Sequence, residues 1–173
     1  MNTQDILWKT ENWIFSYRIA GLLIEDGKIL LQKPTNDAGF SVPGGHVGFG
    51  EKNAQTLKRE FREEIGAEIE VQDLKLVGEN FFDWGGKKCQ QIGLYYQVAL
   101  RGKNSIPKTG KFMGIEQIEG RSFALEFHWI PLEELKNLEV YPTGLPALLE
   151  QMDKGVQHFV YDEYEPLAKN PAG

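Results

Sequence analysis

The sequence predicts a single α/β (α+β) domain in which a mixed β-sheet lies between helices. Three observations support this fold class. Strand-like runs are joined by tight glycine turns, one amphipathic helix follows a loop rich in glycine and proline, and two short helical segments come near the end. The predicted order is β-β-loop-α-β-β-β-α-α, and alternation of this kind is typical of a sheet packed against helices.

The first two elements form a predicted hairpin. Runs rich in β-forming residues at 17–24 and 28–32 flank Glu25-Asp26-Gly27, and Asp-Gly is a strong signal for a tight turn. Residues 33–52 contain two prolines and five glycines. This composition predicts a loop.

A helix follows this loop. Ala54, Leu57, Phe61 and Ile65 recur at spacings of three and four, and Gly66 is expected to end the helix. The remaining elements are strands at 69–82, 92–100 and 122–130, a long polar loop at 101–121, and short helices at 132–138 and 145–154. Gly85-Gly86 is the expected turn between the first two of these strands.

Length and composition bound the class of protein. The chain has 173 residues and a net charge of −6, with 41% hydrophobic and 25% charged residues, which predicts a globular domain. No apolar run approaches the ~20 residues of a membrane span, and the N-terminus does not resemble a signal peptide. Cys89 is the only cysteine, so a reducing cytoplasm is the expected location. The acidic balance argues against a nucleic-acid partner.

We expect the domain to occupy residues 13–155. Residues 1–12 are interpreted as an N-terminal arm and residues 156–173 as a C-terminal extension. An acidic chain needs something other than net charge to attract an anionic substrate, and a bound cation would serve.

Three glutamates stand together on the predicted helix. At roughly 100° per residue, Glu60, Glu63 and Glu64 share an arc of about 100° that borders the apolar stripe. Glu60 and Glu64 are like charges four residues apart near the helix C-terminus, where the macrodipole also disfavours anions. A divalent cation would reverse these penalties, and Mg²⁺ suits carboxylate ligands combined with substrate phosphates.

The spacing around these glutamates is more specific than their number. The segment 45–67 reads Gly, five residues, Glu51, seven residues, Arg59-Glu60-Phe61, one residue, Glu63-Glu64, one residue, Gly66-Ala67. It resembles the box of the Nudix (MutT-like) hydrolase family, and Pro43-Gly44 resembles the usual approach to that box. Ala67 departs from the pattern, since an isoleucine, leucine or valine is usual there. This departure concerns packing more than chemistry.

The resemblance implies a Nudix-type α/β/α sandwich and a reaction. Nudix proteins cleave a nucleoside diphosphate linked to another moiety, by attack of water on phosphorus assisted by Mg²⁺ or Mn²⁺. Carried over residue by residue, it implies that metal is bound by Glu60, Glu63, Glu64 and the carbonyl of Gly44. Glu51 and Arg59 match the pair that braces the loop against the helix, with Glu51 also able to reach metal through water.

Other residues are weaker candidates. The catalytic base in this family is often a carboxylate outside the box, and the candidates are Glu116, Glu119 and Glu126, with Glu119 or Glu126 preferred; a box glutamate is the alternative. Candidate substrate contacts are Gly45, His46 and Phe82.

The substrate is expected to be a small nucleotide, a nucleoside triphosphate or a nucleotide sugar being the leading interpretation. A homodimer is common in the family. Two other readings stay open: a Nudix-fold module that binds a nucleotide without turnover, and a prenyl-diphosphate isomerase relative. The first usually loses box carboxylates, and all are present here. The second calls for a catalytic cysteine, and Cys89 stands far from the box.

Overall fold

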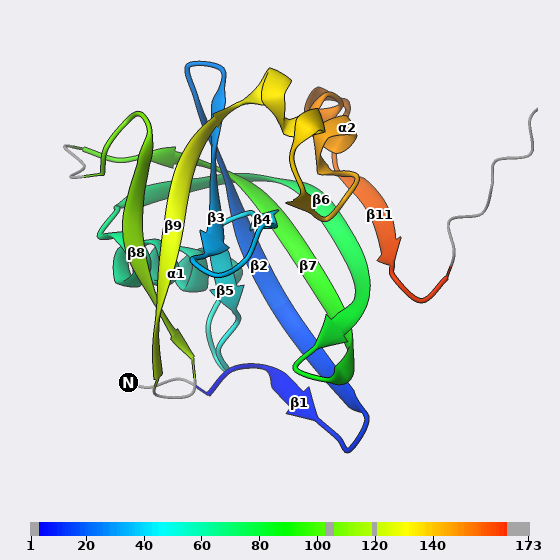
Figure 1. The fold of residues 1–173 in the computed structure, drawn as a ribbon. Helices are drawn as coiled ribbons and strands as arrows, with labels where there is room; N and C mark the ends of the chain where they lie inside the picture. The colour runs from blue at the N-terminus through cyan, green and yellow to red at the C-terminus, as the bar shows by residue number, and fades with distance from the viewer. Residues whose placement is uncertain (1–3, 103–105, 119–120, 166–173) are drawn as a thin grey trace, which may run out of the picture.

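The computed structural model describes residues 4–102, 106–118 and 121–165 (Figure 1). Its strands are β1 (Leu7–Lys9), β2 (Trp13–Glu25), β3 (Lys28–Pro34), β4 (Phe40–Ser41), β5 (Gly44–His46), β6 (Ile69–Trp84), β7 (Lys87–Leu100), β8 (Lys111–Ile118), β9 (Arg121–Pro131), β10 (Val140–Tyr141) and β11 (Gln157–Asp162). The helices are α1 (Asn53–Ile65), α2 (Leu145–Leu149) and the 3₁₀ turns η1 (Leu132–Asn137) and η2 (Met152–Lys154).

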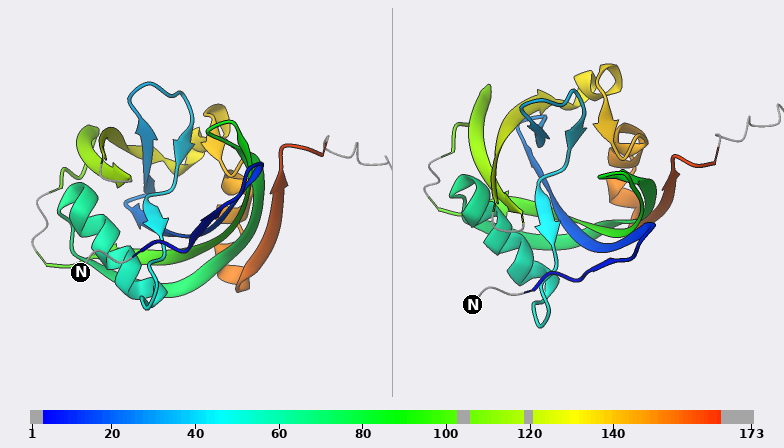
Figure 2. Two further views of the ribbon diagram at one scale, coloured as in Figure 1. Left: turned by 90° about the horizontal axis from the view of Figure 1, so that it is seen from below. Right: turned by 60° about the horizontal axis from the view of Figure 1, so that its bottom comes forward.

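The sheet is mixed, as predicted. Its main path runs β10-β4-β3-β2-β7-β6-β11, while β1 and β5 also pair with β2, and β9 pairs with β3 and β8. β2 and β7 are parallel, whereas β6 and β7 form a long antiparallel hairpin. The strands lie between α1 on one side and α2 on the other (Figure 2).

The central strand β2 explains why both faces of the sheet are covered. Ile19 and Leu23 belong to the core cluster that contains Leu57 and Phe61 of α1. Ala20 and Leu22 belong to the cluster on the other face, which α2 closes with Leu145. Side chains alternate between the faces of a strand, so an uninterrupted apolar run requires cover on both sides.

Local signals set the predicted turns and the helix end. Asp26 and Gly27 have positive φ angles of 49° and 72°, and Glu25 pairs directly with Lys28, as a two-residue hairpin requires. Gly66 ends α1 in the left-handed region with φ 66°, and its amide donates to the carbonyl of Arg62.

Three predictions about the loops and helices need correction. The predicted loop 33–52 contains the short strands β4 and β5. The predicted loop 101–121 contains β8, which pairs with β9 along its length. The predicted helices near the end are short and partly 3₁₀, so the second helical layer is thin. The glycine in β8, Gly114, contributed to the incorrect loop prediction. It is needed for close packing, because an added Cβ would lie 2.7 Å from the carbonyl oxygen of Glu64 and 2.5 Å from the Phe127 ring.

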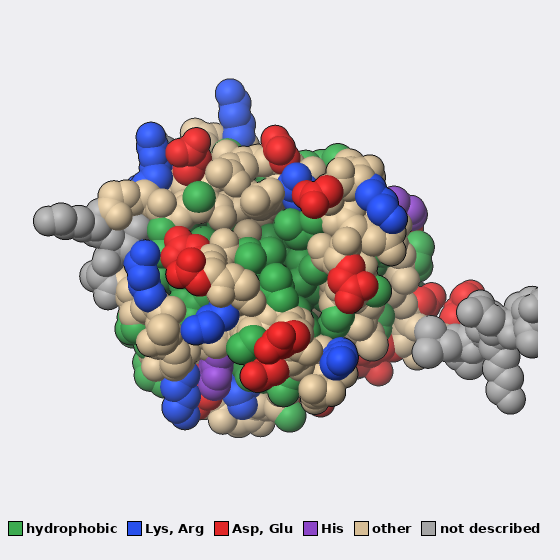
Figure 3. Space-filling view, turned by 90° about the horizontal axis from the view of Figure 1, so that it is seen from above, with side chains coloured by type: hydrophobic (Ala, Val, Ile, Leu, Met, Phe, Trp, Pro, Cys, Tyr) green, Lys and Arg blue, Asp and Glu red, His purple; other side chains and the backbone are tan. Residues whose placement is uncertain are grey.

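The sheet also extends past both expected ends of the domain. β1, within the segment interpreted as an arm, pairs with the first part of β2. β11, within the segment interpreted as an extension, runs parallel to β6 from Gln157 opposite Leu76 to Asp162 opposite Phe81. Seen from above, the surface has a hollow filled with hydrophobic side chains and ringed by charges of both signs (Figure 3). No helix in the described ranges is long and apolar enough to cross a membrane.

Candidate active site

The glycines before α1 allow its carboxylates to approach the sheet closely. A Cβ on Gly45 would lie 2.3 Å from the carboxyl carbon of Glu60. A Cβ on Gly44, whose φ is 154°, would lie 2.1 Å from the carbonyl oxygen of Ile19. Gly44 is therefore required by the close contact of β5 with the backbone of β2, whereas a side chain at position 45 would displace the Glu60 carboxylate.

Glu51 is held by a set of donors that fix the loop against the helix. Arg59 donates from Nε to Oε1 and from Nη2 to Oε2, each at 3.0 Å. The Thr56 hydroxyl donates to Oε2 at 2.7 Å, and the Gly48 amide does so at 3.3 Å. The hydrogen bond from Arg59 is the largest cause that lowers the pKa of Glu51 to about 2. Glu51 is consequently an ionised brace.

Arg59 also reaches the two glutamates that follow it. Its Nη1 donates to Glu60 Oε1 at 2.7 Å and to Glu63 Oε2 at 3.2 Å. The Glu60 side chain is 14% exposed, whereas that of Glu63 is 53% exposed. Burial raises the pKa of Glu60 to about 7 despite the charge of Arg59.

Glu64 has the opposite surroundings to Glu51. The residue is 6% exposed, and neither carboxylate oxygen has a hydrogen-bond partner within the described structure. Burial, followed by the charges of Glu60 and Glu116, raises the pKa of Glu64 well above its ordinary value. An ionised carboxylate in such a place is unfavourable unless a cation or a donor compensates it.

Arg59 and the three glutamates of α1 line a cavity of about 510 Å³, here named the carboxylate cavity. Its acidic side chains are Asp5, Glu60, Glu63, Glu64 and Glu116, and its basic side chains are Lys9, Arg59 and Lys87. Charges of both signs therefore meet in one site. Such a site can hold cations on its carboxylates and anionic groups on its lysines and arginine.

The base candidates from the sequence fall in different places. Glu116, on β8, lines the carboxylate cavity, and burial raises its pKa. Glu126, on β9, lies outside this cavity and bonds His128 Nε2 at 2.9 Å. Glu119 lies outside the described residues. The β8 strand, which sequence reasoning treated as a loop, is what carries Glu116 to the helix.

The other predicted contacts divide between two cavities. His46 lines the carboxylate cavity and stacks on Trp84 with 5.6 Å between ring centroids. Burial, then the charges of Arg18 and Lys9, lower the pKa of His46 to about 4, so its ring is neutral at pH 7. Phe82 lines a neighbouring cavity.

Sequence reasoning missed Asp5, Lys9 and Arg18. The arm reaches the site because the Ile6 amide donates to the carbonyl of Val47 at 2.7 Å. No spacing rule links the arm to the box. The only sequence signal for the charged residues of the arm was therefore the polar composition of residues 1–12.

The residues present suit a magnesium or manganese ion. Glu64 supplies two unpartnered buried oxygens, and Glu60 lies beside it. Hard oxygen donors of this kind match Mg²⁺ and Mn²⁺.

In the described ranges no three acidic, histidine or cysteine side chains are already gathered as a metal cage. Arg59 instead holds Glu60 and Glu63, and the carbonyl of Gly44 accepts a bond from Arg18 Nη2 at 3.1 Å. A carbonyl oxygen has two lone pairs, so this bond leaves one for a further partner.

The mixed sheet and the glutamates of α1 define a Nudix fold. A family model described as the NUDIX domain matches residues 16–151, and the chain therefore belongs to the NUDIX family of pyrophosphohydrolases.

Solved structures agree on the fold. A UDP-X diphosphatase aligns over 83% of this chain and 66% of its own length, with a TM-score of 0.57 and 18% identity. An ADP-ribose pyrophosphatase from Streptococcus suis aligns over 83% of this chain and 98% of its own, with a TM-score of 0.57 and 15% identity. A mutator MutT protein from Bacillus halodurans aligns over 88% and 95%, with a TM-score of 0.56 and 18% identity. At these identities the likeness shows the fold alone.

Proposed function

We propose that this Nudix hydrolase uses Mg²⁺ or Mn²⁺ to cleave a phosphoanhydride bond in a nucleoside diphosphate linked to another moiety. Water attacks phosphorus, and a nucleoside triphosphate or a nucleotide sugar is the substrate class. The observation that carries the proposal is the buried, unpartnered carboxylate of Glu64 beside Glu60 and Glu116. Without a cation this arrangement is unfavourable, and with one it becomes a binding site for phosphate oxygens.

The metal would be held by Glu60, Glu63 and Glu64, with the carbonyl of Gly44 as a further ligand. When bound, the ion polarises phosphorus and lowers the pKa of water. Glu51 stays with Arg59 as the brace, because hydrogen bonds from Arg59, Thr56 and Gly48 already converge on its carboxylate.

Glu116 is the proposed general base. It lines the same cavity as the metal-binding glutamates, and burial raises its pKa, which brings a carboxylate closer to the range useful for proton transfer at neutral pH. Glu126 is engaged by His128 outside the cavity, so its position favours a structural role.

Phosphate groups would lie between the metal and the basic side of the cavity. Two lysines line this basic side: Lys9 at the end of β1 and Lys87 at the start of β7. Lys87 Nζ also donates to the carbonyl of Thr10 at 2.6 Å, which ties the arm to the hairpin. These ammonium groups would offset the charge of a polyphosphate.

The test is release of phosphate or pyrophosphate from nucleoside triphosphates, nucleotide sugars, ADP-ribose and dinucleoside polyphosphates. Each is assayed with and without Mg²⁺ or Mn²⁺, for the wild type, for Glu63→Gln and for the exposed control Glu133→Gln. We expect metal-dependent cleavage of one class, lost in Glu63→Gln and kept in the control. Near-normal turnover by Glu63→Gln would refute the metal assignment.

The two other readings have less support. A binding module without turnover would bind one of these nucleotides and cleave none. The isomerase reading needs a thiol at the site, but Cys89 is buried on β7 and lines neither the carboxylate cavity nor the cavity that contains Phe82. A homodimer and a cytoplasmic location stay predictions from the sequence.

A further inference from the structure

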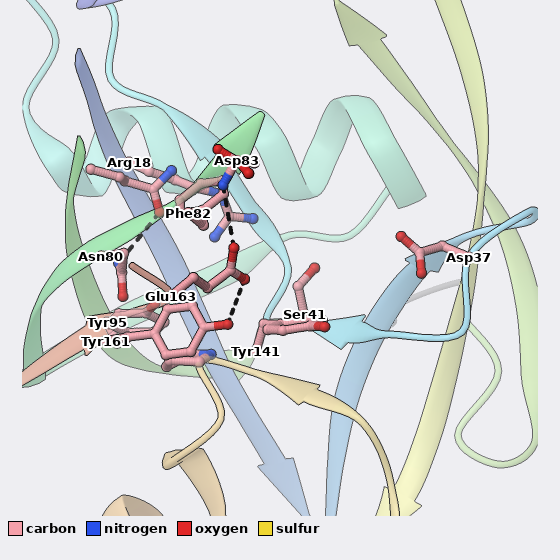
Figure 4. A pocket seen from close by; sticks show the side chains of 12 residues that line it. Arg18, Asp37, Ser41, Asn80, Phe82, Asp83, Tyr95, Tyr141, Tyr161 and Glu163 are labelled. Atoms are coloured by element: carbon pink, nitrogen blue, oxygen red, sulfur yellow. Dashed lines mark hydrogen bonds between the residues drawn. The ribbon is translucent and has the colours of Figure 1, made fainter. Parts of the chain in front are cut away.

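A second cavity, of about 390 Å³, lies next to the carboxylate cavity and is here named the aromatic cavity (Figure 4). Consecutive residues of one strand connect the two: Phe82 and Asp83 line the aromatic cavity, and Trp84 lines the carboxylate cavity. Successive strand residues rise by only ~3.3 Å. A single nucleotide could therefore reach both cavities.

The walls of the aromatic cavity suit a flat ring. Four aromatic side chains line it from the strands β6, β7, β10 and β11, namely Phe82, Tyr95, Tyr141 and Tyr161. Tyr141 and Tyr161 are tilted against each other with 6.2 Å between ring centroids. Aromatic side chains stack on nucleobases whatever the base, so these walls favour a base without selecting one.

The polar groups of this cavity are mainly acceptors. Asp37, Asp83 and Glu163 contribute carboxylates, and Glu163 lies between Asp83 and Tyr161 in Figure 4. Glu163 accepts from the Tyr161 hydroxyl at 2.6 Å and from the Asp83 amide at 3.3 Å. An ionised carboxylate has about four lone-pair sites and no donor, so acceptor capacity remains after these bonds.

Asn80 adds a buried acceptor whose orientation is set by its neighbours. It is 4% exposed, and its Nδ2 donates to Gln91 Oε1 at 3.4 Å. Gln91 Nε2 in turn donates to the hydroxyl oxygen of Ser16 at 3.2 Å. This chain leaves Asn80 Oδ1 as an acceptor with no partner in the described structure. A donor from a ligand would satisfy it.

Arg18 is the one basic side chain that lines the aromatic cavity in the described ranges. Its Nη2 already donates to the carbonyls of Val42 and Gly44, each at 3.1 Å. With three carboxylates and one guanidinium the cavity is net negative, which disfavours phosphate there. The carboxylate cavity also has more acidic than basic side chains, but a metal ion on its glutamates, together with Lys9 and Lys87, would offset the charge of the phosphates there.

We propose that the aromatic cavity binds the nucleobase of the substrate and prefers bases with an exocyclic amino group, namely guanine, adenine and cytosine, over uracil and thymine. The proposal rests on the proposed function, because it assumes a nucleotide substrate. An amino group offers the N–H donors that the carboxylates and Asn80 accept, whereas the keto pyrimidines would place carbonyl oxygens against these acceptors. Polar groups of a binding site that are left without a hydrogen-bond partner are the strongest source of discrimination between similar ligands.

The test compares CMP with UMP, which match in size and differ at position 4, an amino group in CMP and a carbonyl in UMP, and at N3, which carries a proton only in UMP. Both are titrated without metal, alongside GMP and AMP, and binding is followed by NMR shifts of the side-chain amides of Asn80 and Gln91. We expect CMP, GMP and AMP each to bind at least about tenfold more tightly than UMP. Binding of UMP as tight as that of CMP, or no binding of any of the four, overturns the proposal.

Two variants test the location. Asp83→Asn and Asp37→Asn each remove a carboxylate while keeping the shape, and the new amide in Asp37→Asn still offers an oxygen to the Gly39 amide, as Asp37 does at 3.0 Å. We expect the ratio of the UMP to the CMP dissociation constant to fall in both variants, while both fold as the wild type does. The ratio should stay unchanged in Glu133→Gln. An unaltered preference in both aspartate variants also overturns the proposal. If the wild type binds CMP and UMP equally but still cleaves nucleotides with metal, only this inference fails and the hydrolase stands.

Discussion

The two ends of the box segment use the same residue type in opposite ways. Glu51, before α1, is surrounded by the donors of Arg59, Thr56 and Gly48, and its pKa falls to about 2. Glu64, in the last turn of α1, is buried without a donor, and its pKa rises well above the ordinary value. One end of the segment is therefore completed by the protein itself, whereas the other leaves two buried oxygens without a partner for the proposed cation.

This contrast has a structural origin. Glu51 lies in the loop, where the side chains of α1 can reach back to it. Glu64 faces β8, where Gly114 allows the strand to approach the helix and Glu116 adds a second negative charge. We expect Glu51 and Glu64 to differ in function as they differ in electrostatics.

The largest effect is expected for Glu64→Gln. The amide keeps the shape but cannot supply a charged metal ligand, so kcat should fall by at least about 10³-fold. The variant should unfold no more easily than the wild type in the absence of metal, because it replaces a buried carboxyl group that has no hydrogen-bond partner. Enzyme assays and urea unfolding at pH 8 measure the two quantities. Normal turnover would mean that Glu64 is a structural residue and not a ligand.

The next effect concerns Glu60 and pH. Its pKa is about 7 when folded, above the ordinary 4.5. Folding therefore favours the protonated form, and the stability this contributes is present below pH 4.5 and lost as the pH rises through about 7. The metal-free protein should lose about 3 kcal/mol of unfolding free energy from this group between those limits.

Urea unfolding across this pH range tests the Glu60 prediction. Glu60→Gln should flatten the slope, and Mg²⁺ should raise the melting temperature more at pH 8 than at pH 5, because it needs the ionised form. An identical slope in wild type and variant would show that the carboxylate titrates normally.

A third comparison separates the base candidates. Glu116→Gln should lower kcat by about 10²-fold, since a positioned base contributes this much. Glu126→Gln is the matched control on the neighbouring strand and should retain activity. Equal, small losses of kcat in both variants would mean that the base is a box glutamate or Glu119.

The smallest effect tests the completed end. Arg59→Lys loses the paired bonds to Glu51, which an ammonium cannot reproduce, and should cost about 1–3 kcal/mol in the free energy of unfolding. Arg62→Lys is the control, because Arg62 makes the same kind of paired contact with Glu68 on the exposed surface. Thermal unfolding should show a loss only for Arg59→Lys. Equal losses in both variants would mean that the Glu51 brace adds nothing beyond a surface ion pair.

The sequence by itself determined the features that depend on neighbouring residues. The hairpin at Asp26-Gly27, the extent of α1 and its end at Gly66 follow from local conformational preferences and helical spacing. The box glutamates are recognisable for the same reason, since their spacing within one loop and helix defines them.

Only the tertiary structure decided which distant residues complete the site. β8 escaped sequence reasoning because Gly114 reads as a loop residue until the helix it packs against is known. The proposed choice of Glu116 over Glu126 depends on which strand lines the carboxylate cavity. Lys9 reaches that cavity through the pairing of β1 with β2, and Arg18 reaches the carbonyl of Gly44 where β2 pairs with β5. These contacts join residues far apart in sequence, and strand register together with close packing, which no local pattern encodes, brings them together.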